Sequence, residues 1–296
     1  MKGLSFAKVW AVARYELTWD LRKKRTYLIV GIFLFAALYF GYILPVINGK
    51  SITTVSYNNG PSVGSDLWWV TAVYLAFNYP ISGVFPILIG GFISADSLGS
   101  EFDSNTIVPL LSQPVRRLEV YAGKFVEKLF LLLFVSAVFT LLVLATSEIS
   151  VGAQSHLEMF PLLMSAQLGA FLDYAALAFF FGSFVRSGTM VLEILVGVFF
   201  VMLATVTALI LQIGEQVWTF FLPVANADFL LHVVPYYIFQ PSGTMILLGG
   251  YMGNWSPPVA VASISALEFV AAGLVVNLFV ALVGGYYIFR RAEVKE

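Results

Sequence analysis

Residues 125–146 read FVEKLFLLLFVSAVFTLLVLAT, and this stretch decides the class of fold. A helix needs about 20 mostly apolar residues to cross a hydrocarbon core of about 30 Å. The stretch meets this requirement, because its only charged residues are Glu127 and Lys128 near its start. It lacks the alternation of apolar and polar residues that marks a strand of an outer-membrane barrel. The sequence therefore predicts a membrane-spanning α-helix here.

Five other stretches have the same character. Together they predict six spans, at 27–47, 67–92, 125–146, 160–184, 190–213 and 267–289. The second contains Pro80 and Pro86, each of which removes a backbone donor and kinks a helix. The expected fold is an all-α integral membrane protein, with one transmembrane domain that covers residues 1–296.

The composition excludes several classes of protein. Apolar residues make up 59% of the 296 residues and charged residues only 11%, against about 25% charged in an ordinary soluble domain. A net charge of −1 argues against a nucleic-acid partner. The chain has no cysteine, which excludes disulfides and thiolate catalysis. His156 and His232 show no ligand spacing, so we expect no metal site, and the chain has no catalytic motif of a membrane hydrolase.

The orientation follows from the basic residues. If the six spans are correct, 15 of the 16 Lys and Arg residues lie on one side of the membrane and Lys50 lies alone on the other. Basic residues concentrate on the cytoplasmic side of membrane proteins. We therefore expect a multi-pass protein of the cell membrane with both termini in the cytoplasm.

Residues 214–266 allow two interpretations. Their segment 229–252 is apolar enough to suggest a seventh span, but it contains His232, Pro235, Pro241 and several glycines. A seventh span would also place the basic C-terminus outside. We favour a large external loop with re-entrant or short helices, whose irregular backbone must be satisfied by surrounding protein or by water.

The first 26 residues predict an amphipathic helix on the inner membrane surface. One face of a helical wheel carries the apolar residues Phe6, Trp10, Ala13, Leu17 and Leu21. The basic run 22–25 follows and would bind anionic lipid headgroups. A solvated basic tail is the alternative, but it does not account for the apolar stripe. Membrane lipid is thus an expected partner.

The cytoplasmic segment 93–124 is the most informative part of the chain. It contains helix-capping Ser and Asp residues and is interrupted by Pro109 and Pro114. It would present a charged, partly apolar surface to the cytoplasm. Residues alone leave open whether this surface binds a partner or the segment is only a capped connector.

This segment resembles the cytoplasmic loop of ABC-2-type ABC transporter permeases. The resemblance rests on an ordered set of positions, namely Asp96, Glu101, Thr106, Leu110, Leu111, Ser112, Pro114, Val115, Arg117, Glu119, Gly123 and Lys124. The N-terminal interfacial helix, the six spans and the large last external loop are similar to the family in layout. Two positions depart from the family pattern, because Asn105 replaces a glycine and Phe102 a basic residue.

The resemblance implies a membrane subunit that works with a separate ATP-binding subunit and with a second permease copy, either identical or a paralogue. The coupling contacts to the ATPase would come from Asp96, Glu101, Phe102, Asp103, Thr106, Leu111, Pro114 and Arg117. ATP and Mg²⁺ would be bound by the partner, and this chain would hold no cofactor and carry out no catalysis. Residues 49–51 are Gly-Lys-Ser, the sequence that ends a phosphate-binding loop. Leu44 occupies the position where such a loop requires a glycine, so the motif is incomplete.

Polar residues near the middle of the predicted spans form the second candidate site. Asp173 lies near mid-bilayer in the fourth span, and Gln167 lies on the same helix. Charged groups at this depth cost several kcal/mol or more and are commonly functional. The two residues either line a substrate or proton pathway, or they hold helices together by hydrogen bonds.

The sequence therefore favours the permease subunit of an ATP-driven ABC-2-type exporter. An ion-coupled secondary transporter that uses Asp173 is the first alternative, although the chain lacks the internal repeat typical of such proteins. A membrane assembly factor without transport activity is the second.

Overall fold

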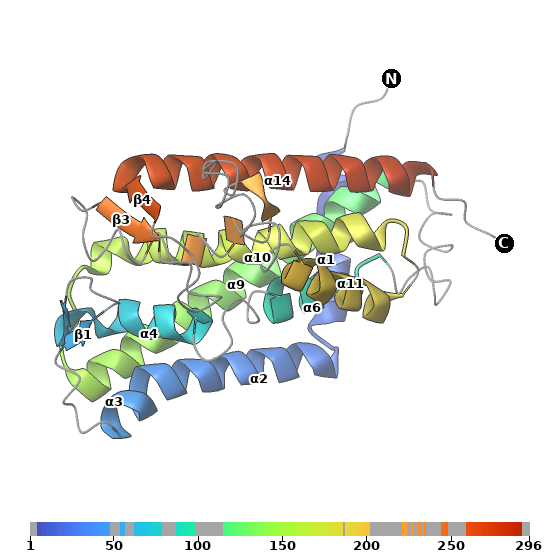
Figure 1. Ribbon diagram of the computed structural model, residues 1–296. Helices are drawn as coiled ribbons and strands as arrows, with labels where there is room; N and C mark the ends of the chain where they lie inside the picture. Colours follow the sequence, from blue (N-terminus) through green and yellow to red (C-terminus); the bar gives the residue numbers. More distant parts are fainter. Residues whose placement is uncertain are drawn as a thin grey trace.

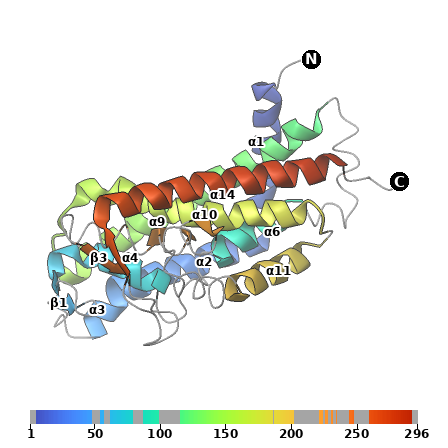
Figure 2. The same cartoon turned by 45° about the horizontal axis from the view of Figure 1, so that its top comes forward.

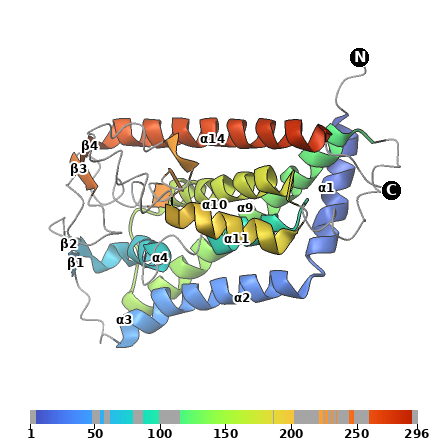
Figure 3. The same ribbon diagram turned by 45° about the vertical axis from the view of Figure 1, so that its right-hand side comes forward.

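The computed structural model describes residues 5–47, 54–56, 62–78, 87–98, 115–185, 187–201, 221–223, 226–227, 230–231, 234, 244–247 and 259–291. These residues form a bundle of helices lying lengthwise beside one another (Figure 1). One helix, α1 (Phe6–Asp20), lies across one end of the bundle instead of along it (Figure 3).

Four long helices form the frame of the bundle. They are α2 (Lys24–Leu38), α9 (Arg117–Val151), α10 (Phe160–Gly182) and α14 (Ser263–Arg291). In the described residues, the segments long and apolar enough to cross a membrane are Thr26–Ile47, Arg117–Val151, Leu157–Gly182 and Glu268–Arg291. The protein is thus a predominantly helical, multi-pass membrane protein.

Shorter apolar helices fill the space between the long ones. The predicted span at 67–92 contains α4 (Trp68–Asn78) and a π-helical segment (Ile87–Gly91) that leads into α6 (Phe92–Ala95). Pro80 and Pro86 lie outside the described residues. The helix α11 (Gly188–Val201) starts the predicted span at 190–213, whose remainder is also outside them. Figure 2 shows α6 between α10 and α11, and all three contact one another.

Four phenylalanines from four helices form the centre of the core. Phe33 of α2 stacks on Phe139 of α9 with 4.2 Å between ring centroids. Phe77 of α4 lies 5.4–6.0 Å from both rings, and Phe171 of α10 lies 5.9 Å from Phe33 and 5.8 Å from Phe77. All four side chains are buried. Aromatic pairs at such distances stabilise packing beyond simple area burial.

The end of α2 departs from regular helix for an identifiable reason. Pro45, in α3 (Leu44–Ile47), lacks an N–H and crowds the carbonyl of Gly41, and a π-helical segment (Tyr39–Ile43) precedes it. Two carbonyls of this segment accept hydrogen bonds from side chains. Trp68 Nε1 donates to Phe40 O at 3.2 Å, and Ser150 Oγ donates to Gly41 O at 2.8 Å. A Cβ on Gly41 would lie 2.0 Å from Thr146 Oγ1, so glycine is needed where α2 meets α9.

Two short hairpins lie at the end of the bundle opposite α1 (Figure 1). Strand β1 (Thr54–Ser56) pairs with β2 (Ser62–Gly64), and β3 (Thr244–Leu247) pairs with β4 (Val259–Ala262), both antiparallel. Because β3 falls inside 229–252, that segment is not one continuous helix. This finding goes against a seventh helical span there.

Candidate functional site

The helix α1 packs against the first turns of α9. Val9, Val12 and Ala13 form the buried part of its contact face. Gly123 permits the close approach, because a Cβ on this residue would lie only 2.7 Å from Cβ of Val12. Because α1 packs closely on α9, it is an integral part of the bundle.

Charged side chains fill the centre of this contact. Lys124 of α9 pairs with Glu16 of α1 at 2.7 Å, and Lys128 pairs with Asp20 of α1. Lys128 also pairs with Glu127 at 3.0 Å. The side chains of Lys124, Glu127 and Lys128 are at most 3% exposed. We call these five residues the ionic cluster.

Helix geometry explains how the ionic cluster forms. Glu16 and Asp20 are four residues apart on α1, and Lys124 and Lys128 have the same spacing on α9. Residues at this spacing share one face of a helix. Because the earlier acid pairs with the earlier lysine and the later with the later, α1 runs in the same sense as the start of α9.

The ionic cluster is energetically sensitive because it is removed from water. Burial alone would raise the pKa of Asp20, but the ammonium groups of Lys128 and Lys23 outweigh burial and hold this pKa below its ordinary value. Removing one member of a buried ion pair costs about 3–5 kcal/mol, because the other charge is left uncompensated. The cluster therefore fixes the register in which α1 docks.

A carboxylate also joins the beginnings of α1 and α9. Glu119 accepts a hydrogen bond from the backbone N–H of Arg116 at 2.9 Å and another from that of Ser5 at 3.1 Å. An acidic group in this position stabilises the start of a helix. It explains why α9 begins at Arg117, so that residues 117–124 of the predicted cytoplasmic segment are helical.

The start of α9 also contacts the end of α14. The guanidinium of Arg117 donates to the carbonyl of Arg290 at 2.7 Å, one of the last acceptors of that helix. Beside it, Tyr121 packs its ring against Phe179 of α10 and Phe289 of α14, with centroids 5.5 and 5.7 Å apart. Arg117 and Tyr121 thus join three long helices at the end of the bundle where α1 lies.

The predicted coupling residues are only partly within the described residues. Asp96 follows α6 and lies against Gly188 at the start of α11. Arg117 contacts α14, as described above. The others lie outside the described residues: Glu101, Phe102, Asp103, Thr106, Leu111 and Pro114.

The two predicted intramembrane residues face different neighbours. Gln167 is buried and its Oε1 accepts a hydrogen bond from Thr140 of α9 at 3.2 Å. Asp173 is 1% exposed and has Asn277 of α14 as a polar neighbour. The structure therefore places Gln167 at the α9–α10 contact and Asp173 at the α10–α14 contact.

Sequence reasoning missed the ionic cluster, although a signal for it was present. Lys124 was noted as a position of the family resemblance and, like Lys128, as a cytoplasmic basic residue, whereas Glu16 and Asp20 were not considered. Two acids and two lysines at matching helical spacing could have suggested that the two helices pair. Their separation of 108 residues along the chain gave no reason to compare them.

A predominantly helical, multi-pass membrane bundle with α1 docked across one end defines the class of protein. Comparison with protein families identifies the chain further, because the model of the ABC-2 family transporter proteins matches residues 10–294. The chain belongs to this family and is a membrane permease of an ABC transporter. Among curated proteins, none matches it.

Proposed function

We propose that this chain is the membrane subunit of an ATP-driven exporter that works with a separate ATPase subunit and a second permease copy. ATP and Mg²⁺ are bound by the ATPase, and this chain forms the substrate pathway. The family match over nearly the whole chain is the observation that carries the proposal. ABC-2 permeases typically work with an ATP-binding subunit.

The described contacts suggest how force from an ATPase reaches the helices. The segment 93–124 leads directly into α9, and the ionic cluster holds α1 on the first turns of α9. Arg117 and Tyr121 hold the ends of α10 and α14 in the same place. A push on the segment would therefore move α1, α9, α10 and α14 together.

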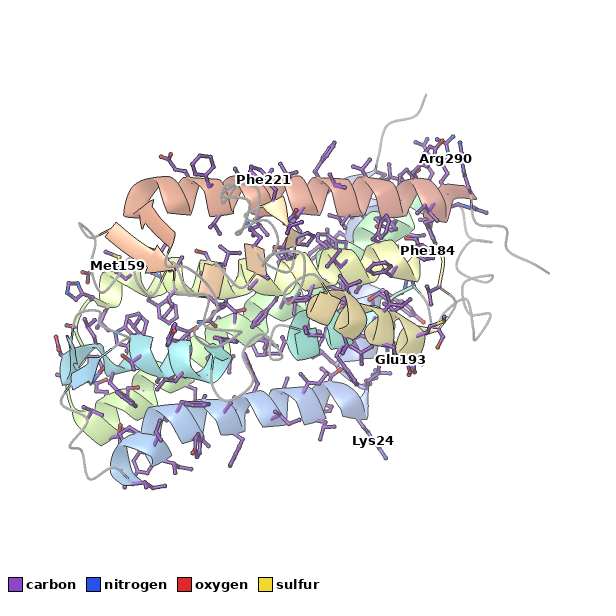
Figure 4. The ribbon with its side chains drawn as sticks, viewed as in Figure 1. Lys24, Met159, Phe184, Glu193, Phe221 and Arg290 are labelled. Atoms are coloured by element: carbon purple, nitrogen blue, oxygen red, sulfur yellow. The ribbon has the colours of Figure 1, made fainter. Side chains whose placement is uncertain are left out.

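Two observations support the part of the proposed six-span topology that places both ends of the bundle's chain on one side of the membrane. The basic residues favour the cytoplasm as that side. Lys24 and Arg290 lie at the same end of the bundle, far from Met159 (Figure 4). Gly169 approaches Leu274 and Phe180 approaches Gly284, so α10 and α14 run parallel. If two spans run parallel, the chain between them must cross the membrane an odd number of times. One span at 190–213 and an external loop at 214–266 meet this requirement.

Charge reversal in the coupling segment tests the proposal. We expect Glu101→Arg to insert and fold normally but to lose its ATPase subunit on purification, or to retain it with ATP hydrolysis uncoupled from transport. Loss of a charged pair at a partly buried interface costs about 2–5 kcal/mol, and like-charge repulsion adds to it.

The matched control is Glu158→Arg, at the other end of the bundle. Glu158 is 66% exposed and pairs with His156 at 3.0 Å, a type of surface pair that contributes about 1 kcal/mol or less. This variant should keep the ATPase and the coupling. If Glu101→Arg also retains a fully coupled ATPase, segment 93–124 is only a connector and the proposed coupling route is wrong.

A further inference from the structure

Asp173 lies in the interior of α10, away from both ends of the helix. It precedes the last residue of α10, Gly182, by a distance of about 14 Å at about 1.5 Å per residue. Its side chain is 1% exposed, and Asn277 of α14, its polar neighbour, is 7% exposed. Both residues therefore lie deep within two membrane-spanning helices.

Tight apolar packing isolates this pair along the helices. On one side of it, Leu274 fills the space over Gly169, and on the other side Phe180 lies against Gly284. The described elements that pack on α10 are α6, α9, α11, α14 and the segments Ile87–Gly91 and Leu157–Met159. None of them places an acidic or basic side chain against Asp173. The carboxyl group is thus away from water and has no counter-ion among the described residues.

The hydrogen-bonding groups of the pair are unsatisfied. Neither carboxylate oxygen of Asp173 makes a hydrogen bond of normal geometry to a described residue, and neither does Nδ2 of Asn277, although the two side chains are close enough to interact. Burying a polar group without a partner costs about 1–3 kcal/mol, and burying an isolated carboxylate costs far more. A negatively charged Asp173 is therefore strongly disfavoured in this packing.

A proton removes the buried charge and allows the two side chains to bond to each other. A neutral carboxylic acid has one O–H donor and one carbonyl acceptor, and a carboxamide offers an N–H donor and a carbonyl acceptor. The two groups can therefore make two reciprocal hydrogen bonds, Oδ–H to the Asn277 oxygen and Nδ2–H to the Asp173 oxygen. The second N–H of the Asn277 carboxamide remains available to another acceptor.

We infer that Asp173 is a proton-binding site, and that the neutral acid pairs with Asn277 to clamp α10 against α14. The proton comes from water and returns to water when the two helices separate enough to hydrate the carboxylate. The packed arrangement thus takes up one proton and an opened arrangement releases it. This site requires no particular transport substrate and does not depend on the proposed coupling to an ATPase.

Infrared spectroscopy of the protein in lipid nanodiscs tests the clamp without measuring transport. At neutral pH the wild type should show the carbonyl stretch of a protonated carboxylic acid, and this band should disappear in Asp173→Asn, which keeps the shape and hydrogen-bonding capacity. In Asn277→Leu the band should remain and move to the higher frequency of an unbonded acid.

A matched control is Asp66→Asn, because Asp66 is exposed and accepts a hydrogen bond from Ser155 Oγ at 2.7 Å. This variant should leave the band unchanged. If Asp173→Asn removes no acid band, Asp173 is ionised and no proton is bound. If Asn277→Leu leaves the band frequency unchanged, the proton is bound but Asn277 does not hold it, and the clamp is refuted.

Discussion

Replacement of Lys128 by methionine should release α1 from the bundle. Lys128 is the cation between Asp20 and Glu127, and its side chain is 3% exposed. Methionine retains the apolar stem but leaves two buried carboxylates without their shared partner. Asp20 keeps Lys23 as a partner, whose side chain is 30% exposed and therefore screened by water. We expect a loss of about 3–5 kcal/mol from the docking of α1.

That loss is comparable to the free energy that apolar burial contributes to the docking of α1. Val9 and Val12 are the larger apolar side chains buried in the contact, and each contributes about 1.5–3 kcal/mol when fully buried. Within the described part of the chain, the ion pairs of Lys128 are those with Asp20 and Glu127. The variant should therefore detach α1 and leave the packing of α2, α4, α9 and α10 in place.

Cysteine labelling measures the detachment directly, because the chain has no native cysteine. Ala13, in α1, is 2% exposed, so Ala13→Cys should react slowly with a maleimide in the wild-type background. With Lys128→Met the rate should rise about 100-fold to a few thousand-fold, since each 1.4 kcal/mol corresponds to about tenfold. Arg14→Met, at an exposed position on the same helix, should leave the rate unchanged.

A triple variant separates charge from shape. Asp20→Asn, Glu127→Gln and Lys128→Met together leave no uncompensated buried charge, because Lys23, which loses Asp20, is 30% exposed. Replacing a complete buried ion pair is often neutral. Labelling of Ala13→Cys should then return close to the wild-type rate. If Lys128→Met alone labels as slowly as the wild type, Lys128 does not hold α1 in place. If the triple variant labels as fast as the single one, uncompensated charge is not the cause of the detachment.

Three further predictions concern the same end of the bundle and the topology. Gly123→Leu should also expose α1 to labelling, because its side chain would overlap Val12, whereas an unchanged rate would show that the approach is not tight. The Asp20 pKa is lowered in the folded protein, so its stabilisation should be complete well above the unfolded value of about 3.9 and be lost as pH falls below that value. Thermal unfolding in nanodiscs at pH 3–6 should show this loss in the wild type and less of it in Asp20→Asn. In intact cells, an impermeant thiol reagent should label Ser155→Cys and not Asn105→Cys, and the reverse pattern would overturn the orientation.

The sequence predicted the membrane class of the fold because hydropathy reports directly on burial in lipid. The long apolar runs at 125–146 and 267–289 lie within α9 and α14. Helix ends were harder to predict, because they depend on contacts from distant residues. The start of α9 is an example, since Glu119 is held by the N–H of Ser5, which is remote along the chain.

For the amphipathic helix α1, the sequence predicted the face that is free to contact lipid but not the face that contacts protein. Phe6, Trp10 and Leu21 of the predicted apolar stripe remain exposed and available to lipid, whereas Ala13 is buried against α9. A helical wheel identifies an apolar face but cannot tell that a second face binds protein. The acids of that second face, Glu16 and Asp20, would be read as solvated from sequence alone, and only the lysines of α9 explain their burial.

The most direct test of the central claim is native mass spectrometry of the purified complex. The chain would be expressed in its own host, so that its native partners are present, and extracted from the membrane in mild detergent. We expect an assembly of two permease copies with two ATPase subunits that hydrolyses ATP. Recovery of the permease alone, folded and without bound ATPase, would contradict it.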